Sequence, residues 1–204
     1  MYSAMPIELL GAFVLFAFVT SITPGPNNMM LLASGVNFGI RRTIPHMLGI
    51  SIGFLLLVVA VGMGLHQLFE RFPASYQALR YAGGAYLLYL AWKIARAGAP
   101  EAADAQGSQP MSFLQAAAFQ WVNPKAWVMA VGAIATYLPP DAFISNVIIL
   151  ATLFAVVNLP SVGVWTIIGS LLRRWLEDPR RLRLFNVGMA ALLVASLYPL
   201  LTSA

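Results

Sequence analysis

The chain contains no cysteine, and only 9% of its 204 residues are charged. The absence of cysteine excludes disulfides and metal sites built from thiolates. Ordinary soluble domains are about 25% charged and about 45–50% apolar, whereas 60% of this chain is hydrophobic. Composition therefore argues against a soluble globular fold, and the sequence predicts an all-α, polytopic membrane protein.

Other absences narrow the function. No Ser/His/Asp or paired-carboxylate arrangement and no glycine-rich phosphate-binding motif is present, so we expect neither an enzyme nor a bound cofactor. His46 and His66 stand alone, without clustered acids, so we expect no metal site. The net charge of +5 comes from arginines in short loops between apolar runs. This distribution argues against nucleic-acid binding and favours a role in membrane orientation.

Six apolar segments are long enough to cross a lipid bilayer, which takes about 20 helical residues. The N-terminus, MYSAMPIELL, lacks the basic residues of a signal peptide, so we expect the first segment to be retained. The polar segment 96–111 divides a single transmembrane domain (1–204) into a first half (1–95) and a second half (112–204). The predicted segments cover about residues 6–22, with an apolar continuation to 36, then 43–65, 76–94, 113–138, 143–172 and 184–201.

Lysine and arginine are unequally distributed between the two sides of these segments. Nine lie in the loops after the first, third and fifth segments, against Arg71 and Arg80 on the other side. The positive-inside rule therefore predicts that the nine are cytoplasmic and that both termini are outside. The nine residues are Arg41, Arg42, Lys93, Arg96, Arg173, Arg174, Arg180, Arg181 and Arg183.

Proline interrupts the first and the fourth segment. Pro24 and Pro26 have no N–H, so the carbonyls of Thr20 and Ile22 lose their helical partners. In a bilayer, such a break persists only inside protein or beside a cavity. Because each half has three segments, the second half enters the membrane from the opposite side. Pro124 then interrupts the first segment of the second half, just as Pro24 and Pro26 interrupt the first segment of the first half. Paired breaks in an inverted 3+3 repeat indicate the binding site of a transporter.

The two breaks offer groups of both signs to a ligand. Asn123 is a good N-cap with Pro124 at the first helical position, and Pro26-Asn27 can start a helix in the same way. Each new helix start presents unpaired N–H groups and a partial positive charge, which suit a carboxylate. The freed carbonyls of Thr20, Ile22 and Gln120 suit an ammonium group, so the pattern predicts a site for a zwitterionic amino acid.

The predicted site residues fall into two groups. We expect Asn27, Asn28, Gln120, Asn123, Lys125 and Asn158 to bind substrate, and Pro24, Gly25, Pro26, Pro124 and Pro160 to shape the site. Two assignments stay open at this point. Lys125 lies either at the membrane midplane, about 18 Å from both ends of its segment, or near the cytoplasmic surface. Asn158 and Pro160 either line the cavity or make a structural kink.

Several motifs resemble the LysE/RhtB family of bacterial amino-acid exporters over nearly the whole chain. The segment TPGPNNMMLLASGVNFGIRRTIPHMLGISIGF is similar to the family's PGPN box, basic loop and G-xxx-G helix. GGAYLLYLAWK and NPKAW resemble its third- and fourth-segment signatures. TPGPNN with GISIGF looks closest to the exporters of cysteine and O-acetylserine. Many family members carry Asp where this chain has Phe54, a departure shared with that branch.

The resemblance implies a secondary exporter of small neutral amino acids or derivatives, driven by the proton gradient across the bacterial inner membrane. It leaves the proton-coupling residue unassigned and leaves room for a homo-oligomer. Two other classes remain open on the sequence. One is a metal or inorganic-ion exporter of similar topology, and the other is a membrane-embedded enzyme or structural subunit.

Overall fold

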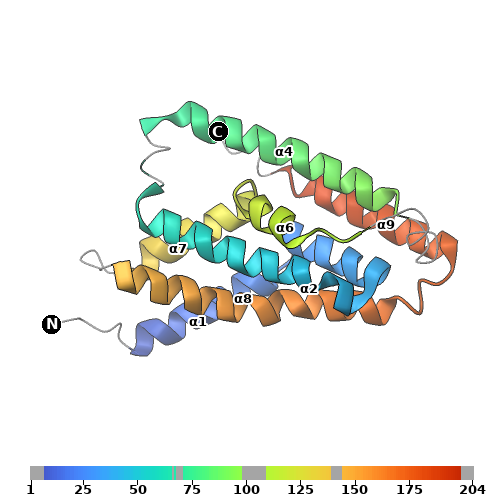
Figure 1. Cartoon of the computed structure of the whole chain (residues 1–204), viewed down its shortest axis with the longest axis horizontal. Helices are drawn as coiled ribbons and strands as arrows, with labels where there is room; N and C mark the ends of the chain where they lie inside the picture. Colours follow the sequence, from blue (N-terminus) through green and yellow to red (C-terminus); the bar gives the residue numbers. More distant parts are fainter. Residues whose placement is uncertain (1–6, 66, 68–70, 98–108, 139–143, 199–204) are drawn as a thin grey trace.

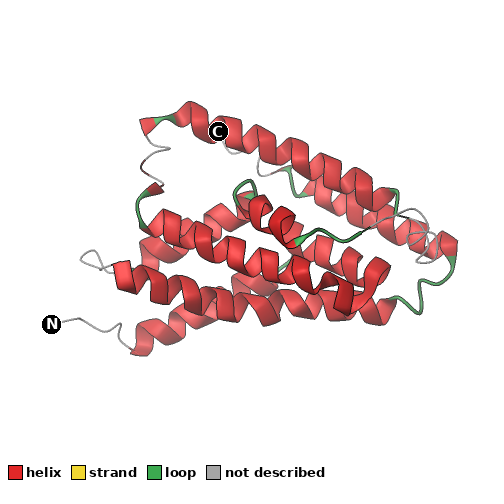
Figure 2. Cartoon of the chain, in the orientation of Figure 1, coloured by secondary structure: helices red, strands yellow, loops and turns green. Residues whose placement is uncertain are grey.

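The computed structural model describes residues 7–65, 67, 71–97, 109–138 and 144–198, and these residues form helices and no strands (Figure 2). The predicted all-α class is confirmed. The helices are α1 (Ile7–Ile22), α2 (Pro26–Gly62), α4 (Pro73–Ala95), α6 (Phe113–Gln120), α7 (Pro124–Tyr137), α8 (Ile144–Leu172) and α9 (Pro179–Ala195).

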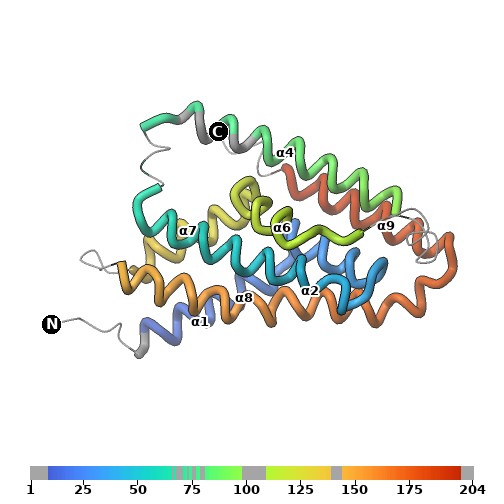
Figure 3. The backbone as a smooth tube through the Cα atoms, viewed as in Figure 1, coloured from blue at the N-terminus to red at the C-terminus, as the bar shows by residue number. Residues whose placement is uncertain are grey.

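Both predicted proline breaks are present in the backbone. The first lies between α1 and α2 and the second between α6 and α7, where the backbone turns before continuing (Figure 3). Pro26 and Pro124 each begin the following helix, where the missing N–H removes no intrahelical hydrogen bond. The breaks therefore follow directly from local sequence.

The loop expected at residues 37–42 is much shorter than predicted. Helix α2 runs through this region and departs from helical geometry only at Gly39, with φ 76° and ψ 174°. Glycine reaches this left-handed φ without the steric cost of a side chain. Its carbonyl accepts a hydrogen bond of 2.8 Å from Thr43 Oγ1. One residue thus suffices to divide α2 into two segments, 26–38 and 40–62.

The sixth apolar segment begins earlier than expected. Helix α9 starts at Pro179 rather than near residue 184, because Asp178 caps it by accepting a hydrogen bond of 2.7 Å from the Arg180 amide. An apolar pattern alone does not include this polar first turn. Residues 98–108 of the expected 96–111 segment, residues 139–143 and residues 199–201 lie outside the described residues.

Small residues set the closest helix contacts. A Cβ added at Gly53 would lie 2.5 Å from Cα of Ala117 on α6, and one at Gly49 would meet the backbone of Phe113. The Gly49-xxx-Gly53 spacing therefore allows α2 to approach α6 closely. Gly35 of α2 and Gly169 of α8 pack in the same way against each other's helices.

The outer surface is apolar on every described helix. Large hydrophobic side chains are exposed on all seven, among them Leu15, Leu56, Leu88, Leu114, Val128, Leu171 and Leu184. Large exposed apolar patches mark faces in contact with membrane or protein. Among the described helices, α2 and α8 are long and apolar enough to cross a membrane by themselves.

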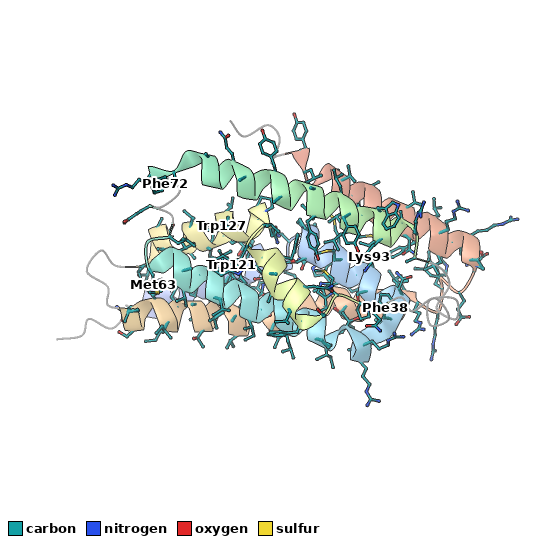
Figure 4. The ribbon with its side chains drawn as sticks, turned by 45° about the horizontal axis from the view of Figure 1, so that its top comes forward. Phe38, Met63, Phe72, Lys93, Trp121 and Trp127 are labelled. Atoms are coloured by element: carbon teal, nitrogen blue, oxygen red, sulfur yellow. The ribbon has the colours of Figure 1, made fainter. Side chains whose placement is uncertain are left out.

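The helices connect at two ends of an elongated bundle. The Gly39 turn, the end of α4 and the α8–α9 connection lie at one end (Figure 1), and Gly39 approaches the Arg173 side chain there. Lys93 and Phe38 lie at this same end, far from Met63 and Phe72 (Figure 4). The three regions that carry the nine basic residues therefore gather at one end of the molecule, which we call the basic end.

Candidate functional site

A small cavity lies between the two helix breaks, and we call it the central cavity. All six residues predicted to bind substrate line it, together with the shaping residue Gly25. Its volume is about 20 Å³, and by this measure one water molecule needs about 10–15 Å³. The remaining lining residues are Thr20, Ser21, Phe54, Ala126, Met129 and Val162. In this conformation the site is nearly closed.

The carbonyl groups at the end of α1 accept hydrogen bonds from other groups of the protein. Thr23 Oγ1 donates to the Thr20 carbonyl (3.0 Å), and the Trp165 indole N–H donates to the Ile22 carbonyl (3.0 Å). The side-chain amide of Asn28 donates to the carbonyls of Ser21 and Thr23, both at 2.8 Å. The loss of helical partners at Thr20 and Ile22 is as predicted, but side chains of the protein replace those partners.

Lys125 brings its ammonium group to the same break. Nζ donates to the Thr23 carbonyl (2.7 Å), the Thr23 hydroxyl (3.0 Å) and the Pro24 carbonyl (3.2 Å). Among the described residues no carboxylate is paired with it. The carbonyl end of a helix carries partial negative charge, which stabilises a nearby cation. The carbonyls that we expected to bind a substrate ammonium group thus lie beside an ammonium group of the protein itself, that of Lys125.

Position 25 has no room for a larger residue than glycine, because the Lys125 side chain passes over it. A Cβ at position 25 would lie 2.7 Å from Cδ of Lys125. Gly25 occupies the N-cap position of α2 and provides no side chain to cap it. The Asn27 side chain does not cap this helix either, since it donates to Gln120 Oε1 (2.8 Å) and accepts from Gln120 Nε2 (3.2 Å). The start of α2 is therefore left without a side-chain cap beside the central cavity.

The second break is held by its own neighbours. Asn123 Oδ1 accepts from the Lys125 amide (3.1 Å), which confirms Asn123 as the N-cap of α7. The Trp127 indole N–H donates to the Trp121 carbonyl (2.8 Å), and both rings lie near this break (Figure 4). The backbone carbonyl of Gln120 accepts from the Asn123 amide (3.4 Å). Gln120 therefore reaches the cavity through its side chain.

Asn158 connects three helices behind the cavity. Its Nδ2 donates to Ser21 Oγ (3.1 Å) on α1, and its Oδ1 accepts from Ser51 Oγ (3.0 Å) on α2. Asn158 also lines the central cavity. Helix α8 continues through Pro160, which is exposed and does not line the cavity. Phe54 lines the cavity and packs edge-on against Phe154, with ring centroids 4.7 Å apart.

Sequence reasoning missed several groups that build this site. Thr23 and Ser21 stand directly before the first break, where a search for groups near the freed carbonyls would have found them. Trp165 gives no local signal, because it is 143 residues from the carbonyl it serves. Ser51 likewise lies 107 residues from Asn158. These contacts exist only after the helices have packed.

Known proteins resemble this chain over most of its length. The profile of the LysE type translocator family matches residues 18–200. The chain belongs to the LysE family. It is 34% identical over 191 residues to the cysteine/O-acetylserine efflux proteins of Escherichia coli strain K12 and Shigella sonnei strain Ss046, covering 93% of this chain and 96% of each relative. No solved structure matches the chain.

Family membership confirms the resemblance read from the PGPN box and the similarity to the cysteine and O-acetylserine branch. The protein is accordingly a LysE-family membrane protein with apolar helices. The first break, TPGPNN, is the segment that carries the resemblance, and three of its residues, Gly25, Asn27 and Asn28, line the central cavity.

Proposed function

We propose that this LysE-family protein exports small neutral amino acids or their derivatives, with cysteine and O-acetylserine as the first substrates to test. The main support is that six polar residues predicted from separate segments meet in one cavity at two helix breaks. The activity for which its relatives are named, cysteine and O-acetylserine efflux, points to the same substrate class.

The cavity offers binding groups that match a zwitterion. A substrate carboxylate can pair with the Lys125 ammonium and with the uncapped start of α2. A substrate ammonium group can take over the Thr23 and Pro24 carbonyls, or the amide oxygens of Asn27 and Gln120. Binding would then require the Lys125 side chain to leave contacts that it makes in the closed conformation.

We further propose six membrane spans arranged as an inverted 3+3 repeat. On this assignment α1 with residues 26–38 forms the first span, residues 40–62 the second, α4 the third, α6 with α7 the fourth, α8 the fifth and α9 the sixth. The single-residue turn at Gly39 supports the division of α2. The gathering of nine basic residues at one end supports the placing of that end in the cytoplasm of a bacterial inner membrane, with both termini outside.

Counterflow in proteoliposomes tests the function. Purified protein should exchange labelled cysteine or O-acetylserine, and an imposed pH gradient should drive net transport if the exporter is proton-coupled. A panel of neutral, cationic and acidic amino acids defines the substrate class. No exchange of any amino acid would contradict the proposal, and transport of metal or inorganic ions alone would favour the ion-exporter alternative.

Orientation has a direct test because the chain has no native cysteine. Single cysteines at Arg181 and at Arg71, on exposed positions at opposite ends, should react differently with a membrane-impermeant thiol reagent. In intact cells whose outer membrane has been made permeable, we expect labelling at position 71 and protection at position 181. The reverse pattern would invert the proposed topology.

A further inference from the structure

A second and larger cavity lies at the basic end of the molecule. It has a volume of about 260 Å³ and is formed by α2, the end of α4 and residues 109–111. An engineered apolar cavity of about 150 Å³ is large enough to bind benzene, so this one has room for a small amino acid. The central cavity, with about 20 Å³, has no such room in this conformation.

The walls of this basic-end cavity carry positive charge. Lys93 and Arg96 of α4 line it, and among the described residues no carboxylate does. The two cations lie over aromatic rings, Lys93 over Tyr89 at 5.9 Å and Arg96 over Trp92 at 4.6 Å. In the described part of the chain neither forms a hydrogen bond or an ion pair, so their N–H donors are available to a ligand.

His46 of α2 contributes an unpartnered polar group from another wall. The side chain is only 2% exposed, and neither ring nitrogen has a hydrogen-bond partner within the described residues. An unsatisfied buried polar group is costly, and a native protein that keeps one has a use for it. A neutral imidazole can donate one hydrogen bond and accept another, which suits a ligand that carries both a carboxylate and an ammonium group.

Two buried polar side chains of the cavity, Ser34 and Asn37, keep their own partners. Ser34 is hydrogen-bonded to Thr43 (2.8 Å), and Asn37 donates to Asn186 Oδ1 (3.1 Å). They fix the cavity wall. Among the buried or charged side chains of the cavity, those left for a ligand are therefore His46, Lys93 and Arg96, and the exposed side chains of Trp92 and Gln109 also line it.

The first segment of α2 joins the two cavities. Asn27 and Asn28 at its start line the central cavity, whereas Met30, Ala33 and Ser34 line the basic-end cavity. At 1.5 Å per residue, Asn27 and Ser34 are about 10 Å apart along the helix. A ligand at the basic end is thus about two helical turns from the site between the breaks.

We propose that the basic-end cavity is a second binding site, which takes the carboxylate of a small amino acid through Lys93, Arg96 and His46. This inference rests on the proposed function, because it places the substrate on its way to the central cavity. The ligand class is a small amino-carboxylate.

Equilibrium binding to purified protein tests the site. Labelled cysteine under reducing conditions is the probe, and the Lys125→Met variant serves as background because it removes the ammonium group of the central cavity. In this background, 3-mercaptopropionate, which has no amine, should displace the probe. Cysteamine, which has no carboxylate, should not.

Charge-matched double variants locate the binding. Lys93→Gln with Arg96→Gln should weaken cysteine binding in this background about tenfold or more, since both charged donors are lost. Arg180→Gln with Arg181→Gln removes the same charge at the same end, and Arg181 also lies over a tryptophan, Trp175. This control pair does not line the cavity and should bind as its parent does. His46→Gln should weaken binding less than the Lys93/Arg96 double variant.

The outcomes separate the two proposals. Binding that does not depend on the carboxylate, or that is unchanged in the Lys93/Arg96 double variant, would overturn the basic-end site. Carboxylate-dependent binding that those substitutions abolish, in a protein that shows no amino-acid counterflow, would uphold the site and overturn the exporter function.

Discussion

The two helix breaks look alike in sequence but are stabilised differently. At the first break, the carbonyl end of α1 depends on Lys125 of α7 and Trp165 of α8, which are more than 100 residues away. At the second, Asn123, Trp127 and the backbone satisfy each other within six residues. The backbone of the second break is therefore held by nearby residues, whereas the first depends on donors from two other helices in addition to its local bonds from Thr23 and Asn28.

This difference suggests which break rearranges when substrate binds. The Lys125 ammonium group, which holds the first break, lies at the central cavity. A substrate ammonium group that enters this cavity can therefore replace it. At the second break the partner from a distant helix is the neutral side chain of Asn27, which is hydrogen-bonded to Gln120. Four experiments test this comparison, given from the largest expected effect to the smallest.

The largest effect is expected from Lys125→Met. It removes the ammonium group that binds the Thr23 and Pro24 carbonyls and that we assign to the substrate carboxylate. Hydrogen bonds to a charged group are worth about 1.5–3 kcal/mol, so the initial rate of cysteine counterflow should fall roughly 10- to 100-fold. Lys125→Arg keeps the charge, so its rate of counterflow should fall less. A wild-type rate for Lys125→Met in correctly inserted protein would remove Lys125 from the site.

A matched pair of tryptophan substitutions compares the two breaks directly. Trp165→Phe and Trp127→Phe each remove one indole N–H, from the Ile22 and the Trp121 carbonyl respectively. Each should lower the free energy of unfolding by about 1 kcal/mol. Only Trp165→Phe should also lower the transport rate, by several-fold. Equal transport rates in the two variants would show that the breaks are functionally equivalent.

A double-mutant cycle tests the amide pair that connects the breaks. Asn27 and Gln120 exchange two hydrogen bonds, at 2.8 and 3.2 Å. Asn27→Ala, Gln120→Ala and the double variant should show a coupling of about 1 kcal/mol in thermal unfolding. Because Gln120 also donates to the Ala116 carbonyl, its single variant should be the less stable. Strict additivity would argue that the two breaks are independent.

The smallest effect should come from the N-cap of α7. Asn123→Ala removes the acceptor for the Lys125 amide and should lower the free energy of unfolding by about 1 kcal/mol. Asn123→Ser keeps a capping oxygen and should therefore be nearly as stable as the wild type. If Asn123 also contacts substrate, as proposed, Asn123→Ser will still transport more slowly than the wild type. Counterflow by Asn123→Ser at the wild-type rate would leave Asn123 with the capping role alone.

Much of the site could be predicted because proline acts locally. Pro24, Pro26 and Pro124 lack an N–H, so the residues next to each break are enough to predict it and to predict the starts of α2 and α7. The G-xxx-G contact of α2 was also readable, since small residues are needed wherever two helices meet closely. Where the pattern was weaker the boundaries were wrong, as at the Gly39 turn and the polar first turn of α9.

The sequence by itself determined that two helices break and that polar side chains accompany each break. Only the tertiary structure decided which groups satisfy the exposed carbonyls, because the donors of Lys125 and Trp165 arrive from helices distant in the chain. It also decided that His46 lacks a partner and that a cavity opens beside Lys93 and Arg96. A proline removes a hydrogen bond wherever it stands, but the group that replaces that bond depends on how the helices pack.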